Sequence, residues 1–155
     1  MSRLSETQQA YGRVRELLDQ EILKRTGPTG LEQCRETLDV AFYLLGWAQF
    51  EYLVREEART RIEEMAKAQT IERHAWQFLQ RNLRNFPVRN RLGLIFHDQP
   101  AVRDELDKDY DIRNDAAHNY KLLPKEAKDI AVWLKDLEDL VEKFERETTP
   151  LPPQA

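Results

Sequence analysis

The fold of this chain depends most on residues 31–58, which read LEQCRETLDVAFYLLGWAQFEYLVREEA. Apolar residues from Leu31 to Tyr52 recur every three or four positions and predict one apolar side of a helix. A second stripe, from Val40 to Ala58, follows the same helix and includes Glu51. Because a helix that is apolar on two sides must be covered on two sides, we expect it at the centre of a bundle or in a subunit interface.

The same spacing predicts further helices on both sides of this stretch. It is visible within residues 4–24, 71–86, 102–110 and 127–144. Breaks fall within 27–30 and at Pro87 and Pro124, and Pro100 indicates a helix that starts at Asp98 or Gln99. Residues 56–69 are polar and predict a solvated helix end and turn. Since no strand-like alternation is visible, we predict an all-α, up-and-down bundle of about five helices, the last of which starts near Pro124.

Composition limits the class of protein. With 155 residues the chain suits one domain, which we place at 1–147, followed by a flexible Pro-rich tail at 148–155. The single cysteine, Cys34, leaves no disulfide framework and favours a reducing cytoplasm. The first residues lack the apolar core of a signal peptide, and the most apolar run, 40–48, is too short to cross a bilayer. A net charge of -4 argues against coating nucleic acid through bulk charge.

The segment with the most chemistry is residues 113–120, which read Arg-Asn-Asp-Ala-Ala-His-Asn-Tyr. An Arg and a His separated by four to six residues carry little weight alone, since about one such match is expected here by chance. Arg91 and His97 form another match, but the residues between them are apolar or Gly and predict a buried segment that ends in a helix-terminal His. In 113–120, by contrast, the Arg is followed by a polar Asn, and a Tyr follows the His shortly before the last helix.

This arrangement resembles the HEPN superfamily, in which an Arg, a polar residue and a His lie just before the last helix of a small helical bundle. The form Arg-x4-His-x-Tyr is similar to that of HepT-type toxins. The resemblance implies a metal-independent endoribonuclease, a toxin or defence effector, that acts as a homodimer with two copies of the motif in one cleft. It also implies an antitoxin of the nucleotidyltransferase type, which would modify Tyr120.

The predicted chemistry assigns each motif residue a role. His118 would act as general acid and base on an RNA 2′-hydroxyl and the leaving 5′-oxygen. Arg113 would bind the phosphate and stabilise its developing charge, while Asn114 would hold the His or the phosphate. Because the 2′-hydroxyl is the nucleophile, no metal or cofactor is needed, and DNA should resist cleavage. The expected products carry 2′,3′-cyclic phosphate and 5′-hydroxyl ends.

Helix geometry restricts this hypothesis. Two residues five apart on a straight helix point about 140° away from each other. We therefore expect either that the helix ends near Ala117 or that a second subunit supplies the missing groups. In the structural alternative, Arg113 pairs with Glu51 or with an Asp of the 104–111 run, and His118 caps a helix end. Tyr120 would then be an ordinary core residue, and Glu51 a buried carboxylate for which Arg113 is a candidate partner.

The only strongly basic run lies at residues 81–91. It contains four arginines and no acid, a pattern that favours contact with RNA phosphates or, equally, a solvated helix end: Arg81, Arg84, Arg89 and Arg91. The alternative to an enzyme is a catalytically silent helical module that binds a partner protein or a nucleotide.

Overall fold

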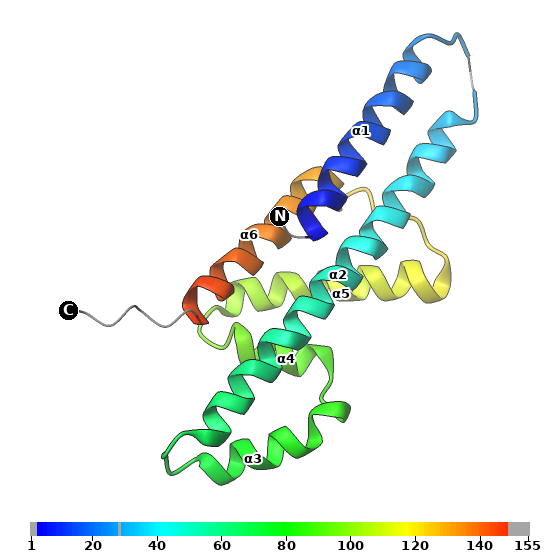
Figure 1. Cartoon of the computed structure of the whole chain (residues 1–155). Helices are drawn as coiled ribbons and strands as arrows, with labels where there is room; N and C mark the ends of the chain where they lie inside the picture. Colours follow the sequence, from blue (N-terminus) through cyan, green and yellow to red (C-terminus); the bar gives the residue numbers. More distant parts are fainter. Residues whose placement is uncertain (1–2, 28, 149–155) are drawn as a thin grey trace, which may run out of the picture. The chain divides into compact units, whose positions relative to one another are not determined.

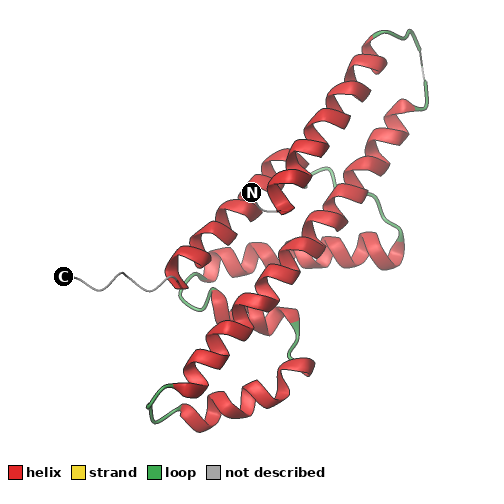
Figure 2. Cartoon of the chain, viewed as in Figure 1, coloured by secondary structure: helices red, strands yellow, loops and turns green. Residues whose placement is uncertain are grey.

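The computed structural model describes residues 3–27 and 29–148, which form helices joined by loops (Figures 1 and 2). The helices are α1 (Arg3–Leu23), α2 (Leu31–Lys67), α3 (Arg73–Asn82), the 3-10 turn η1 (Leu83–Asn85), α4 (Val88–Ile95), α5 (Pro100–Asn119) and α6 (Ile130–Thr148). The all-α class is confirmed. The described residues form one α-helix more than the expected five or so, because the short apolar stretch after Pro87 forms a helix of its own, α4. Thr148, the first residue of the predicted tail, is the last residue of α6, and the rest of that tail lies outside the described residues.

The chain divides into two compact units. Of the described residues, unit 1 comprises those up to Phe50 together with Lys108–Leu140, and unit 2 comprises Glu51–Asp107 together with those from Val141 to Thr148. No linker or change of composition marks this division in the sequence, because its boundaries fall inside α2, α5 and α6. None of the described helices is both long and apolar enough to cross a membrane.

Unit 1 is built around the first half of α2. In Figure 1, α1 runs antiparallel to this half, and the Tyr11 hydroxyl donates a hydrogen bond to Asp39 at 2.7 Å. The ring of Tyr43 stacks on Trp133 of α6, with centroids 4.1 Å apart. Both side chains also bind Asp109 of α5: the Tyr43 hydroxyl donates to its backbone oxygen and the Trp133 indole donates to its carboxylate, each at 2.9 Å. Three helices therefore meet at one residue.

Unit 2 corrects the prediction for residues 56–69. These residues continue α2 to Lys67 and are not a solvated turn, because Val54, Ala58, Ile62 and Ala66 form a buried stripe at a spacing of four. Glu57 is buried beside this stripe and accepts a hydrogen bond from Arg61 at 2.6 Å. Residues of α4, α5 and α6, with Phe96 directly after α4, complete the core of the unit. These residues are Leu92, Ile95, Phe96, Leu106, Val141 and Phe144.

The two apolar stripes of α2 differ in burial. The stripe that contains Trp47 and Val54 is buried or half-buried along its whole length. The other stripe is exposed at Cys34, Ala41, Leu45, Ala48 and Tyr52, and Leu45 keeps 46% of its surface accessible. The described residues therefore cover α2 mainly on one side.

The start of α6 is also corrected. The helix begins at Ile130 and not near Pro124, which lies in a turn closed by a hydrogen bond from Ala127 N–H to Pro124 O at 2.9 Å. Asp129 precedes the helix, and its carboxylate accepts hydrogen bonds from the N–H groups of Ala131 and Val132 at 3.0 and 3.4 Å. Such a cap satisfies N–H groups that the helix itself cannot, so the N-cap residue sets the start.

Gly46 gives a test of the packing in unit 1. A Cβ at this position would meet the Leu134 side chain and lie 2.9 Å from the Trp133 ring. Gly46→Ala should therefore destabilise the protein by about 1–3 kcal/mol, the usual cost of overpacking. Gly12→Ala is the matched control, because a Cβ on this α1 residue meets nothing within 4 Å. It should stabilise by up to about 1 kcal/mol, the helix preference of Ala over Gly. Urea unfolding measures both, and a stabilised Gly46→Ala protein would contradict the packing.

Asp129 gives a second test, with a defined pH dependence. Burial alone would raise the pKa of its carboxyl, but the hydrogen bond and charge of Arg15 and the two cap N–H groups lower it overall. Asp129→Ala should cost about 1 kcal/mol through the lost cap, whereas Asp129→Asn should cost less because Asn caps equally well.

The sign of the pH effect follows from the lowered pKa. The ionised carboxylate of Asp129 stabilises the folded state at any pH above the pKa that this group has in the unfolded chain, about 4. As the pH falls below that value the carboxylate becomes protonated, and the stabilisation is lost. The difference between wild type and Asp129→Ala should thus be larger in urea unfolding at about pH 7 than at about pH 3. An equal difference at both values would show that the charged form contributes nothing.

Candidate functional site

The motif lies on one continuous helix. Because α5 extends to Asn119, the expectation that it ends near Ala117 is wrong. Arg113 and His118 therefore remain about 140° apart around the helix axis. A single α5 does not direct both side chains at one phosphate.

Arg113 is held by its own neighbours. Its Nη1 donates a hydrogen bond to Asn114 Oδ1 at 2.9 Å, and its Cζ lies 6.0 Å from the centroid of the Tyr110 ring. The side chain is half-buried. Asn114 thus positions the guanidinium, whereas the sequence suggested that it holds the His or the phosphate. The suggested partner Glu51 instead pairs with Arg55 at 3.5 Å, one turn along α2.

His118 and Tyr120 are both exposed at the end of α5. Among the described residues, no hydrogen bond or ion pair engages the imidazole of His118. Tyr120 keeps 91% of its surface accessible, so the alternative of a core tyrosine is wrong. Its φ of 55° lies in the left-handed region, which a non-glycine residue seldom adopts.

Asp115 stabilises this end of the helix. Its carboxylate accepts hydrogen bonds from Asn119 Nδ2 at 2.8 Å and from Lys121 Nζ at 2.9 Å, and both lower the pKa of its carboxyl, the lysine more. The Lys121 N–H also reaches back to the Asp115 backbone oxygen at 3.4 Å. These contacts turn the chain sharply at Tyr120. The sequence assigned no role to Asp115.

The four arginines of the basic run have different surroundings. Arg91 is buried, and its Nε and Nη2 donate hydrogen bonds to the backbone oxygens of Phe86 and Leu83 at 2.8 and 2.7 Å. Arg89 pairs with Asp107 at 3.0 Å, and Arg81 donates to Gln77 O on its own helix at 3.3 Å. Arg84 is exposed. The structure therefore does not make one uniform basic surface of this run.

Arg84 and Arg91 nevertheless line the same hollow in unit 2. It has a volume of about 400 Å³ and is lined by Glu51, Arg55, Arg84, Phe86, Val88 and Arg91. We call it the arginine hollow. The sequence gives no signal for Arg55 beyond its spacing of four from Glu51 in a charged part of α2.

The second pair at motif spacing, Arg91 and His97, behaves as predicted. Leu92, Ile95 and Phe96 between them are buried, and His97 follows the end of α4 with Nδ1 3.2 Å from Leu94 O.

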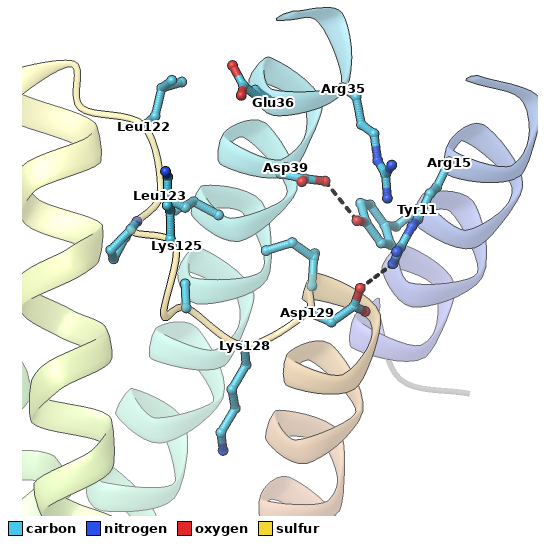
Figure 3. Close-up of a pocket in the computed structure, with 13 residues that line it drawn as sticks. Tyr11, Arg15, Arg35, Glu36, Asp39, Leu122, Leu123, Lys125, Lys128 and Asp129 are labelled. Atoms are coloured by element: carbon cyan, nitrogen blue, oxygen red, sulfur yellow. Dashed lines mark hydrogen bonds and ion pairs between the residues drawn. The ribbon is translucent and has the colours of Figure 1, made fainter. Parts of the chain in front are cut away.

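A second hollow, of about 330 Å³, lies in unit 1 beside the loop that follows the motif (Figure 3). Figure 3 shows Asp39 bonded to Tyr11 and Asp129 bonded to Arg15 across it. Arg35 is paired as well, with Asp19 at 3.1 Å. Four basic lining residues, which include Lys125 and Lys128, face the carboxylates of Glu36, Asp39 and Asp129, so this hollow offers an anion little unbalanced charge. Within the described residues, no group of three His, Cys, Asp or Glu side chains is placed to hold a metal ion.

The backbone at Tyr120 can be tested directly. Tyr120→Gly should raise the free energy of unfolding by about 1 kcal/mol, because glycine adopts a positive φ without the clash of a Cβ. Tyr120→Phe keeps the Cβ and should leave the stability unchanged, since the exposed hydroxyl adds little. If urea unfolding shows that the glycine variant is no more stable than the phenylalanine variant, the left-handed conformation carries no cost.

Comparison with known proteins adds no further constraint on the function. No family model, curated protein or solved structure matches this chain.

Proposed function

We propose that this chain is a metal-independent endoribonuclease of the HEPN type, with Arg113, Asn114 and His118 as its site. The observation that carries the proposal is the position of His118. It is an exposed imidazole with no partner in the described chain, in the last turn of a helix whose Arg113 is held in place by Asn114. The resemblance of residues 113–120 to the HEPN motif supports the same conclusion.

The proposal requires a second copy of the chain. Arg113 and His118 of one α5 point in different directions, so a complete site needs the Arg of one subunit near the His of the other. The exposed apolar stripe of α2 supports a homodimer, because the described residues leave Leu45 and its neighbours exposed. Each isologous dimer would contain the motif twice.

In such a site the chemistry follows from the side chains. His118 accepts the proton of a 2′-hydroxyl, whose oxygen attacks the adjacent phosphorus and expels the 5′-oxygen. A protonated His118 of either subunit returns a proton to that leaving group. Arg113 stabilises the charge that builds on the phosphate oxygens, and Asn114 keeps its guanidinium oriented. The products carry 2′,3′-cyclic phosphate and 5′-hydroxyl ends, and DNA, which lacks the nucleophile, is not cut.

The biological context belongs to the same proposal. In this proposal the enzyme is a toxin or antiviral defence effector of the cytoplasm, and an antitoxin keeps it inactive. The exposed hydroxyl of Tyr120, two residues from His118, is accessible to a nucleotidyltransferase antitoxin. Modification there would add bulk and negative charge beside the imidazole.

RNA cleavage in EDTA tests the proposal. Purified wild-type protein should cut single-stranded RNA and leave the same DNA sequence intact, and His118→Ala should lower the rate at least about 100-fold, the usual contribution of a general acid or base. Arg113→Ala should lower it as well. His97→Ala is the matched control, because His97 is also exposed and follows an Arg at motif spacing. It should cut like wild type.

Two outcomes would reject the proposal. One is equal cleavage by wild type and His118→Ala, which would identify a contaminating nuclease. The other is a strict monomer in sedimentation that still shows His118-dependent cleavage, which would reject the composite site.

The alternative function is a catalytically silent module that binds a nucleotide or a partner protein. The arginine hollow favours the nucleotide version, since it gathers three guanidinium groups within unit 2 and none of its lining residues belongs to the motif. An intact RNA substrate together with nucleotide binding would support this alternative.

A further inference from the structure

The arginine hollow carries unbalanced positive charge. Three guanidinium groups and one carboxylate line it, which leaves a formal charge of about +2 on its walls. The hollow in unit 1 is closer to balance, because its four basic lining residues face three carboxylates and both of its arginines are paired with an aspartate. An anion would therefore be drawn to the hollow in unit 2.

Arg91 is fixed in a position to receive that anion. Hydrogen bonds to Leu83 O and Phe86 O occupy Nη2 and Nε, which leaves Nη1 outside these two bonds. Burial lowers the pKa of its guanidinium, the charge of Arg55 lowers it further, and Glu51 only partly opposes this. An arginine held rigidly by backbone oxygens loses little conformational entropy when it binds a ligand.

The other two arginines are more adaptable. Arg55 contacts Glu51 at 3.5 Å, which is long for a charged hydrogen bond, and 55% of its side chain is accessible. Arg84 is exposed, and no hydrogen bond or ion pair joins it to another described residue. A ligand that enters the hollow would therefore compete only with the long Glu51 contact of Arg55.

The remaining lining residues, Phe86 and Val88, are apolar. A phosphate or sulfate ion alone would leave this surface unused, whereas a nucleobase stacks well on an aromatic ring. A volume of about 400 Å³ suits one nucleotide and not an extended peptide.

We propose that the arginine hollow binds one nucleotide, with its phosphate between Arg55, Arg84 and Arg91 and its base against Phe86. The phosphate belongs either to a free mononucleotide or to one residue of an RNA strand. The hollow lies entirely within unit 2 and does not contain the motif, so this inference does not depend on ribonuclease activity.

Binding by the full chain tests the inference. The probes are AMP, inorganic phosphate and a short 2′-O-methyl RNA, which lacks the nucleophile needed for cleavage. Arg55→Gln and Arg84→Gln should each weaken AMP binding about tenfold, the effect of losing one charged hydrogen bond. Arg59→Gln is the matched control: Arg59 lies one turn further along α2, has 53% of its side chain accessible and also pairs with a glutamate.

Two further variants sharpen the test. Glu51→Gln should tighten AMP binding, because it removes the one carboxylate among the lining residues. For the 2′-O-methyl RNA, Arg84→Gln should reduce the slope of log K against log salt by about 0.7, the value for one phosphate contact on a single strand. Inorganic phosphate should bind more weakly than AMP, since it makes no contact with Phe86.

The outcomes separate the two sources of the phosphate. Binding of AMP alone identifies a free nucleotide, and binding of the 2′-O-methyl RNA alone identifies a strand. The inference is overturned if neither probe binds, or if Arg59→Gln weakens binding as much as Arg55→Gln and Arg84→Gln do. His118→Ala should bind all probes like wild type, which keeps this result distinct from a failure of the ribonuclease proposal.

Discussion

The packing of unit 1 depends on Asp109. Its backbone oxygen accepts the hydroxyl proton of Tyr43 and its carboxylate accepts the indole N–H of Trp133, so one residue of α5 holds both α2 and α6. Burial raises the pKa of the Tyr43 hydroxyl, and Asp109 raises it further, which keeps this donor protonated. The close approach of α6 to α2 is possible because Gly46 has no side chain. Since Arg113 lies one turn after Asp109, the same contacts fix the helix that presents the motif.

The sequence predicted helices well where large apolar residues repeat at three and four, as in α1 and the first half of α2. It failed for residues 56–69, because the buried stripe there is made partly of Ala58 and Ala66, and because Glu57 looks like a surface residue in sequence. It also placed the start of α6 too early. Pro124 is compatible with a helix start, but the side-chain cap comes from Asp129, and a cap is settled by local geometry.

The motif residues were found from the sequence, but their partners were not. Spacing alone identified Arg113 and His118, whereas the hydrogen bond from Arg113 to Asn114 and the contacts of Asp115 depend on side-chain rotamers and on the path of the loop. The sequence predicted only some of the residues that line the arginine hollow. Its residues Arg84 and Arg91 lie in one run, but Arg55 comes from a different helix, and only the tertiary fold brings them together.

Arg91 connects the arginine hollow with the stability of the turn beside it. Its guanidinium closes the turn at Leu83–Asn85 through two backbone oxygens and lines the hollow at the same time. When this turn opens in a local unfolding event, the wall of the hollow opens with it. Occupancy of the hollow and amide protection in the turn are therefore thermodynamically linked, and a bound anion would slow hydrogen exchange in a segment that otherwise has few buried side chains.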